Sequence, residues 1–191
     1  MVDLSLHILD VVQNSLAGGA TRIAVGITED FSGDLLTIEV CDNGRGIPQE
    51  ILPRVLDPFF TSRSTRDVGL GLPLFKAAAE RCGGSLELDS AEGRGTRVLA
   101  RFALDHFDRA PLGDLGETMS VLIACNPEVD FSYHHRVNGA TYRMDTREMR
   151  EVLGGVSLGA PSVLDFVRRD IQSGLKGIGA ATFPKIMEVL R

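Results

Sequence analysis

The sequence predicts an α+β protein in which helices cover one face of a mostly antiparallel sheet. Segments with helical periodicity alternate with paired short strands, in the order helix, hairpin, helix, helix, hairpin between residues 3 and 104. Turn-forming residues join the strands of each pair, which favours antiparallel neighbours. The chain of 191 residues is also long enough for a second unit. We therefore expect a larger domain over residues 1–106 and a small α+β domain over residues 107–191.

The composition argues against a membrane or nucleic-acid partner. A formal charge of −6 and an isoelectric point near 5.2 disfavour broad binding to nucleic acids. No apolar run approaches the roughly 20 residues that cross a bilayer, and the chain start lacks the basic segment of a signal peptide. The cysteines, Cys41, Cys82 and Cys125, are scattered, which disfavours a disulfide framework or a zinc site. We expect a cytoplasmic location.

The first half of the chain carries the clearest periodicity. Helical spacing of apolar residues predicts helices over residues 3–17, 49–56 and 72–82. Alternation predicts strands at residues 23–27, 36–40, 86–88 and 98–102. Asp3 suits the N-cap of the first helix, and residues 57–67 resemble a loop.

The second half begins with a linker at residues 106–117, HFDRAPLGDLGE, which contains Pro111 and two glycines. Its pattern predicts a strand at 119–124 and then a hairpin over 129–145, in which Asn138-Gly139 suits a type I′ turn. Helices are expected over residues 146–153, where Asp145 and Glu148 resemble a capping box, and after Pro161.

Asp10 and Asn14 lie four residues apart on the first predicted helix and therefore share one of its faces. Magnesium prefers hard oxygen ligands and usually keeps several waters while it binds nucleotide phosphates. An amide oxygen at Asn14, beside a carboxylate that activates a nucleophile at Asp10, would suit such a site. The alternative interpretation is the polar outer face of an amphipathic helix.

The segment Asp42-Asn43-Gly44-Arg45-Gly46-Ile47 directly follows a predicted strand. A carboxylate fixed at a strand end can accept a hydrogen bond from the exocyclic amine of adenine. The two glycines would let the backbone lie against the purine ring. The alternative is a plain turn, for which this composition is also common.

Residues 57–72 form a third segment, DPFFTSRSTRDVGLGL, that ends in spaced glycines at a helix start. Backbone N–H groups and the positive end of a helix dipole favour phosphates there, and Arg63 and Arg66 would add positive charge. A fourth segment, Gly93-Arg94-Gly95-Thr96, lies between two strands and on its own suits a hairpin turn.

Taken in order, QNSLAGGATRI, DNGRGI, DPFFTSRS and VGLGLPLFKAAAERCGGSLELDSAEGRGTRV resemble the N, G1, F, G2 and G3 boxes of the histidine-kinase-like (GHKL, or Bergerat) ATPase superfamily. The resemblance covers about residues 4–104. It looks strongest to the catalytic domain of sensor histidine kinases, while the first box is similar to the MutL-type version.

This resemblance implies a Bergerat-type α/β sandwich that holds ATP and Mg²⁺ between helices and sheet under a mobile lid. It assigns magnesium to Asn14 and adenine to Asp42, with support from Thr96. The complete set of nucleotide-binding residues that we expect is Asn14, Asp42, Gly44, Gly46, Ile47, Phe60, Thr61, Gly69, Leu70, Gly71, Leu72 and Thr96.

Two departures from the family pattern leave three functions open. Asp10 stands where the ATPase and serine-kinase branches carry glutamate, and Asp67 stands where a glycine is common. We expect a cytoplasmic kinase or signalling module with Asp10 as general base, whose phosphoacceptor lies on a partner protein. The alternatives are an ATPase switch of MutL or gyrase type that works through a partner or self-association, and a nucleotide sensor without turnover. His7, His134 and His135 are expected to be ordinary helix and strand residues.

Overall fold

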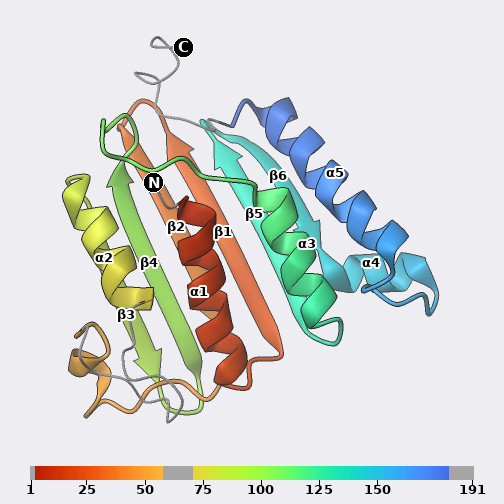
Figure 1. Cartoon of the computed structure of the whole chain (residues 1–191), viewed down its shortest axis with the longest axis horizontal. Helices are drawn as coiled ribbons and strands as arrows, with labels where there is room; N and C mark the ends of the chain where they lie inside the picture. The colour runs from red at the N-terminus through yellow and green to blue at the C-terminus, as the bar shows by residue number, and fades with distance from the viewer. Residues whose placement is uncertain (1–2, 58–70, 181–191) are drawn as a thin grey trace.

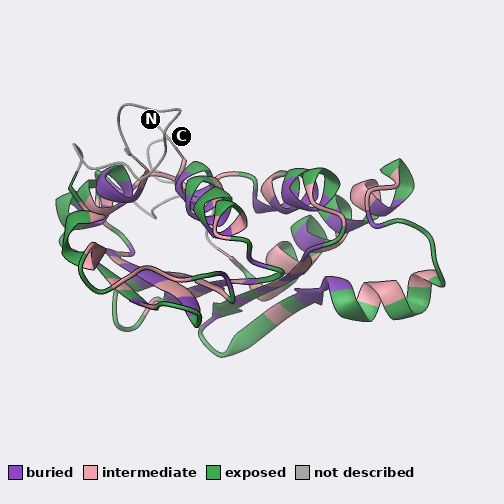
Figure 2. Cartoon of the chain, turned by 90° about the horizontal axis from the view of Figure 1, so that it is seen from below, coloured by how far each residue is buried: buried purple, intermediate pink, exposed green. Residues whose placement is uncertain are grey.

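The computed structural model describes residues 3–57 and 71–180, which fold around one six-stranded sheet (Figure 1). The strands are β1 (Arg22–Asp30), β2 (Leu35–Asp42), β3 (Ser85–Ala91), β4 (Gly95–Ala103), β5 (Asp130–Val137) and β6 (Ala140–Asp145). The helices are α1 (Leu4–Ala17), the 3₁₀ helix η1 (Leu52–Arg54), α2 (Gly71–Arg81), α3 (Leu115–Cys125), α4 (Thr146–Leu153) and α5 (Pro161–Ile178). In Figure 2, α1, α2, α3 and α5 form one layer above the sheet. The predicted α+β fold is therefore confirmed.

The strand order is β3-β4-β2-β1-β5-β6. All neighbouring strands pair antiparallel except β1 and β5, which run parallel. The sheet is thus mixed and mostly antiparallel, and the parallel pair is where the second half of the chain joins the first.

Strands from both sides of the expected boundary at residue 106 belong to this one sheet. β5 lies beside β1 from the pair Arg22↔Asp130 to the pair Glu29↔Val137. One cluster of buried apolar side chains also contains residues from both halves, such as Phe75 before the boundary and Phe131 after it. Residues 107–180 therefore extend the existing sheet and core instead of forming a sheet of their own. The division into two domains stays a prediction.

Two predicted elements are wrong. The strand expected at 119–124 is the middle of α3, because Leu115, Met119 and Leu122 recur at helical spacing and are buried against the sheet. The Asp114 carboxylate caps this helix by accepting a hydrogen bond from the Glu117 N–H at 2.8 Å. The helix expected at 49–56 is reduced to the 3₁₀ turn η1, which has a proline, Pro53, in its first turn and therefore lacks one backbone donor.

The predicted hairpin turn and the start of α4 are confirmed. Asn138 and Gly139 have φ values of 46° and 96°, the left-handed pair that a type I′ turn requires. Asp145 caps α4 by accepting a hydrogen bond from the Arg147 N–H at 2.9 Å. Glu148 instead pairs with the Arg143 guanidinium on the preceding strand β6, so only half of the capping box forms.

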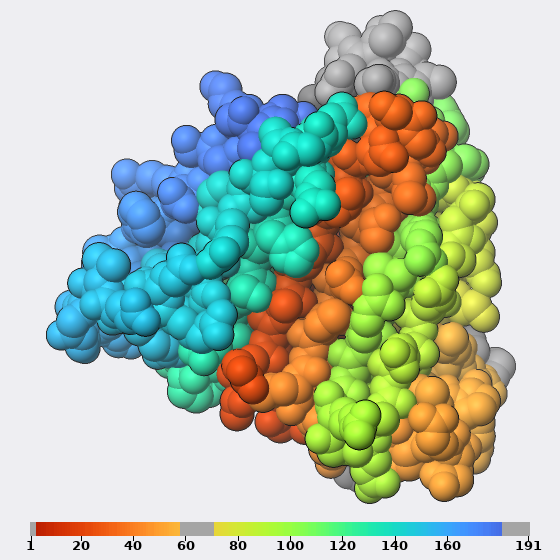
Figure 3. All heavy atoms as spheres, turned by 180° about the vertical axis from the view of Figure 1, so that it is seen from behind, coloured from red at the N-terminus to blue at the C-terminus, as the bar shows by residue number. Residues whose placement is uncertain are grey.

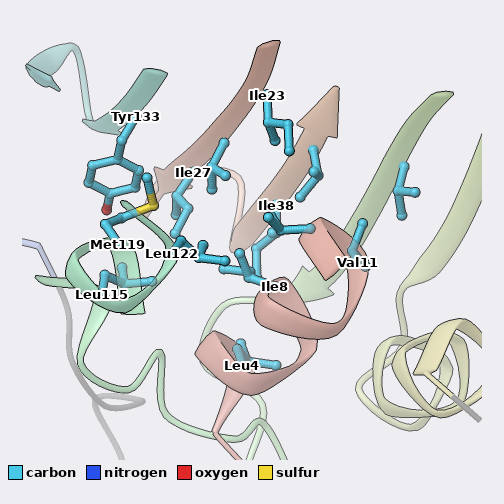
Figure 4. Close-up of a cluster of buried hydrophobic side chains, with 14 of the residues drawn as sticks. Leu4, Ile8, Val11, Ile23, Ile27, Ile38, Leu115, Met119, Leu122 and Tyr133 are labelled. Atoms are coloured by element: carbon cyan, nitrogen blue, oxygen red, sulfur yellow. The ribbon is translucent and has the colours of Figure 1, made fainter. Parts of the chain in front are cut away.

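The core lies between the helical layer and the sheet. One cluster of buried side chains joins α1, α3 and strands from both halves, and Figure 4 labels Leu4, Ile8, Val11, Ile23, Ile27, Ile38, Leu115, Met119, Leu122 and Tyr133. Because α1 buries its apolar stripe here, its opposite face, with Asp10 and Asn14, is turned to solvent.

A chain of polar groups is also buried between β1 and β5. The His135 ring lies 2.7 Å from Glu29 Oε1 through Nε2 and 2.7 Å from the Tyr133 hydroxyl through Nδ1. His135 and Tyr133 are fully buried, and Glu29 is 1% exposed. The neighbouring His134 is exposed, because successive side chains of a strand point to opposite faces of the sheet.

In the part of the chain that the structure describes, no helix lies over the other face of the sheet, whose strands are visible in Figure 3. Ion pairs join neighbouring strands there, Arg97 with Glu39 and Arg101 with Glu87. Within residues 3–57 and 71–180, no helix has both the length and the apolarity to cross a bilayer.

His7 is buried between α1 and α2, where its ring stacks on Phe75 with 5.0 Å between ring centroids. It is a packed helix residue, as predicted. Burial lowers the pKa of His7, while the nearby Asp10 carboxylate raises it and Arg81 lowers it.

This lowered pKa predicts a loss of stability in mild acid. Below about pH 6.5 the unfolded chain takes up a proton at His7 that the folded chain accepts only at lower pH. Protonation therefore favours unfolding between these two pKa values, and the effect is absent at higher pH. Urea unfolding at about pH 7.5 and 5.5 should show a weaker pH dependence for His7→Leu than for the wild-type chain. Equal dependence in the two proteins would contradict the assignment.

Candidate functional site

Asp42, the last residue of β2, holds its carboxylate in a fixed orientation. Oδ1 accepts hydrogen bonds from the backbone N–H groups of Gly44 at 2.8 Å and Thr96 at 3.2 Å. Oδ2 accepts one from the Ser15 hydroxyl at 2.6 Å. Each donor comes from a different element: the loop after β2, strand β4 and helix α1. A carboxylate oxygen has two acceptor directions, so Oδ2 keeps one for a ligand.

Ser15 was not among the residues singled out from the sequence. It is 6% exposed and follows Val11 on the buried stripe of α1, at a position where the helical period calls for an apolar side chain. A hydroxyl at such a position is satisfied only if it finds an acceptor, and here the acceptor is Asp42. Because Ser15 is adjacent to Asn14, it also connects Asp42 to the exposed face of α1.

The loop after Asp42 lies against the turn between β3 and β4. The Arg45 carbonyl accepts a hydrogen bond from the Gly93 N–H at 2.7 Å, and the Gln49 amide donates to the Ser90 carbonyl at 3.1 Å. Gly46 has φ +69°, and a Cβ there would overlap the Ala91 carbonyl oxygen. A glycine is required at this close approach.

Ser90 is the second functional residue that the sequence analysis missed. Its hydroxyl accepts a hydrogen bond from the Ile47 N–H at 2.9 Å, donates to the Gly95 carbonyl at 2.9 Å and lies 2.9 Å from Thr96 Oγ1. The signal was present in the strand pattern, because Ser90 occupies a core-facing position after Leu86 and Leu88.

Asn43 anchors the loop. Its side-chain oxygen accepts hydrogen bonds from the N–H groups of Thr21 at 3.0 Å and Arg22 at 2.8 Å, and its amide donates to the Thr21 hydroxyl at 2.9 Å. The Asn43 side chain therefore holds the start of β1 in place through Thr21 and Arg22. Asp42, not Asn43, is the residue of this pair whose side chain faces the site.

Asp10 and Asn14 lie on the exposed face of α1, one turn apart. Asp10 lies close to the start of α2, since a Cβ on Gly71 would be 3.3 Å from the Asp10 Cβ. The side chain of Leu72 is buried in the core, so its contribution to a ligand site would come from its backbone N–H. Phe60, Thr61, Gly69 and Leu70, together with Arg63, Arg66 and Asp67, lie outside the described residues.

The residue before Asp42, Cys41, adds no charge beside the carboxylate. Burial raises the pKa of the preceding Cys41 to about 11, with a further contribution from Glu39. The Cys41 sulfur therefore stays a neutral thiol near pH 7 and adds no second negative charge beside the carboxylate.

The donor set near Asp10 suits magnesium only together with a nucleotide. Over residues 3–57 and 71–180, no group of three or more His, Cys, Asp or Glu side chains is arranged to hold a metal ion. Mg²⁺ in nucleotide sites takes one or two protein oxygens and completes its shell with phosphates and water. The amide oxygen of Asn14 and the carboxylate of Asp10 match that requirement.

A matched pair of glycine variants tests the packing of this loop. Gly46 and Gly93 both have left-handed backbone, but only Gly46 faces a steric conflict, because nothing lies within 4 Å of a Cβ on Gly93. Alanine at either position costs roughly 1–2 kcal/mol of backbone strain. Gly46→Ala should also separate the loop from the β3–β4 turn and weaken ATP binding about tenfold, whereas Gly93→Ala should leave affinity unchanged. Calorimetric titration checks the difference, and equal affinities in the two variants would contradict it.

Comparison with known proteins agrees with the geometry. Residues 2–106 match the family described as histidine kinase-, DNA gyrase B- and HSP90-like ATPases. The chain is 45% identical over 75 residues to nitrogen regulation protein NtrY of Azorhizobium caulinodans, covering 39% of this chain and 10% of the relative. It is 38% identical over 95 residues to sporulation kinase D of Bacillus subtilis, covering 48% of this chain and 18% of the relative. The chain therefore spans only a small part of the length of these curated relatives.

The fold has a counterpart among solved structures. The N-terminal domain of a DNA repair protein matches 76% of this chain and 53% of its own, with a TM-score of 0.51 and 18% sequence identity. At this identity the likeness concerns the fold alone. The sequence match covers more than half of the chain and includes Asp10, Asn14, Asp42 and Thr96. The chain therefore belongs to the family of histidine kinase-, DNA gyrase B- and HSP90-like ATPases, and is an ATP-binding protein of the histidine-kinase-like type.

Proposed function

We propose that the chain binds Mg·ATP and passes a phosphoryl group, or a nucleotide-dependent signal, to a partner protein in the cytoplasm. The observation that carries this proposal is the Asp42 carboxylate, held by Ser15, Gly44 and Thr96 with one acceptor direction left over. A preorganised acceptor at a strand end suits the amine of adenine, because no reorientation has to precede binding.

The remaining residues fit the rest of the nucleotide. The backbone of Gly44, Gly46 and Ile47 would lie against the purine, with Thr96 beside Asp42. The start of α2, at Gly71 and Leu72, offers N–H groups to phosphates. Phe60, Thr61, Gly69 and Leu70 complete the proposed contacts from the segment that precedes α2. Asn14 would contribute an oxygen to Mg²⁺, whose charge would offset that of the phosphates.

Asp10 is the proposed general base. Its carboxylate is exposed and lies beside the start of α2, so it can accept a proton from a nucleophile that approaches from solvent. His7 is packed against Phe75 and His135 is buried, so neither suits the phosphoacceptor, which we place on a partner.

Label transfer tests the kinase. The chain is incubated with Mg²⁺, γ-phosphate-labelled ATP and the proteins of its source cell, and labelled bands are compared between variants. Asp10→Ala should lower transfer by about a hundredfold or more, since general-base removal typically costs that much. Asp89→Asn, which removes an exposed acid on β3, serves as the matched control. Absence of a labelled partner, together with no effect of Asp10→Ala on ATP turnover, would overturn the kinase.

An ATPase switch is the second candidate, and the shared sheet favours it. Because β5 pairs with β1 and α3 packs on α1, a shift of α1 on nucleotide binding would reach residues 107–180 directly. This candidate predicts slow phosphate release and self-association that requires ATP. Light scattering that gives a monomer in every nucleotide state would rule it out. If the chain binds ATP but neither hydrolyses it nor self-associates, the nucleotide sensor without turnover is the function that remains.

A further inference from the structure

We propose that Ser90 is a positioning residue that makes the nucleotide site selective for a 6-amino over a 6-keto purine. It acts through Thr96, whose hydroxyl it orients so that Thr96 faces the ligand as a hydrogen-bond acceptor. The inference rests on the proposed nucleotide site and adds to it the group that sets its selectivity.

The contacts of Ser90 leave its hydroxyl no freedom. The side chain is 4% exposed and forms a cross-strand pair with Thr96 between β3 and β4. Ser90 Oγ donates to the Gly95 carbonyl and accepts from the Ile47 N–H, each at 2.9 Å. The third neighbour, Thr96 Oγ1, also lies at 2.9 Å.

A serine hydroxyl has one hydrogen and two lone pairs. At Ser90 the hydrogen points to the Gly95 carbonyl and one lone pair receives the Ile47 N–H. The remaining lone pair can only accept, so the hydrogen bond with Thr96 runs from the Thr96 hydroxyl to Ser90. The Thr96 hydrogen is thereby turned away from the site, and the lone pairs of Thr96 Oγ1 are left for a ligand.

Thr96 adjoins Asp42, since its backbone N–H donates to Asp42 Oδ1 at 3.2 Å. Among the residues that the structure describes, Asp42 and Thr96 then present two neighbouring acceptors to the site, a carboxylate and a hydroxyl oxygen. An exocyclic amine supplies two hydrogens to such a pair. A keto oxygen would meet acceptors only, and its own hydrogen bond to water would be lost without replacement.

Removal of the Ser90 hydroxyl should let Thr96 act as a donor as well as an acceptor, while the loop after Asp42 stays in contact with the turn between β3 and β4. The Gln49 amide donates to the backbone carbonyl of Ser90 and the Gly93 N–H donates to the Arg45 carbonyl, and both bonds survive in Ser90→Ala. In that variant the Thr96 hydroxyl is free to rotate and to donate to a keto group.

The experiment measures the affinities of ATP and ITP, which differ at purine position 6, by calorimetry at fixed Mg²⁺. Ser90→Ala should lower the ratio of ATP to ITP affinity at least about fivefold relative to the wild-type chain, as expected for one exchanged hydrogen bond. Ser90→Thr keeps the hydroxyl and should retain the wild-type ratio. Thr96→Val lacks the oriented acceptor and should lower the ratio as Ser90→Ala does.

The outcomes separate the inference from the proposed function. Ser90→Ala that loses affinity for ATP and ITP equally, with a lowered melting temperature, would reduce Ser90 to a structural role and overturn the inference alone. A wild-type chain that binds neither nucleotide would overturn the nucleotide site itself. If Ser90→Ala does not fold, an unchanged ratio in Thr96→Val overturns the inference.

Discussion

Replacement of Asp42 by asparagine is expected to weaken Mg·ATP binding by about a hundredfold or more, close to 2.7 kcal/mol. The asparagine oxygen would take the Oδ1 position, because the N–H groups of Gly44 and Thr96 both point there. The amide NH₂ would then occupy the Oδ2 position and face the adenine amine donor to donor. The variant loses a charge-assisted hydrogen bond, worth about 1.5–3 kcal/mol, and gains a repulsive contact.

The fold should tolerate this change. The Ser15 hydroxyl already lies 3.3 Å from the Val11 carbonyl and can turn to it when Oδ2 no longer accepts. Calorimetric titration of Asp42→Asn should therefore show lost affinity with an almost unchanged melting temperature. Glu39→Gln, on the opposite face of the same strand, is the control and should bind ATP as the wild-type chain does. Wild-type affinity in Asp42→Asn would remove Asp42 from the site.

Replacement of His135 by alanine is expected to destabilise the fold by about 3–5 kcal/mol, the usual cost of breaking a buried pair by removing one partner. His135 lies between Glu29 and Tyr133 with 2.7 Å contacts to both, and all three side chains are buried. Alanine would leave the Glu29 carboxylate without this partner in the core, together with a cavity. Burial, with contributions from the nearby Tyr142 and Glu29, keeps the pKa of Tyr133 well above its usual value, so its phenol stays protonated near pH 7.

His134 provides the matched control, since it neighbours His135 on the same strand but is exposed on the open face of the sheet. His134→Ala should change the free energy of unfolding by no more than about 0.5 kcal/mol. Glu29→Gln keeps an acceptor for the His135 ring and should cost less than His135→Ala. Urea unfolding monitored by circular dichroism gives all three values. Equal losses in His134→Ala and His135→Ala would contradict the role of the buried chain.

The sequence was most informative where a polar residue stood at the end of a regular element. Asp42 was singled out because a carboxylate at a strand end can accept a hydrogen bond from the amine of adenine, although the same composition is also common in plain turns. Ser15 and Ser90 were missed because a hydroxyl at a core position gives no hint of its acceptor, which is 27 positions away for Ser15. Only the folded chain brings such partners together.

The order of the strands in the sheet was harder to predict than the positions of the strands in the sequence. The sequence predicted the hairpin that contains β5, but nothing local to residues 130–137 encodes a parallel partner at β1. The prediction of a strand within α3 was wrong for a similar reason. A short apolar run is compatible with both a strand and a helix, and tertiary packing decides which of the two forms. The segments that repeat family motifs were predicted best, since their order carries information beyond local pattern.

The parallel pairing of β1 with β5 also sets an order for folding during synthesis. Glu29 and His135 are in contact although 106 positions separate them. The edge of β1 that pairs with β5 therefore stays unpaired until most of the chain has been synthesised. Until residue 137 has been made, that edge offers unpaired backbone groups beside the apolar side chains Ile23 and Ile27. A chain cut after residue 106 would keep Asp42 and its hydrogen-bond donors Ser15, Gly44 and Thr96, yet the exposed edge of β1 would promote aggregation.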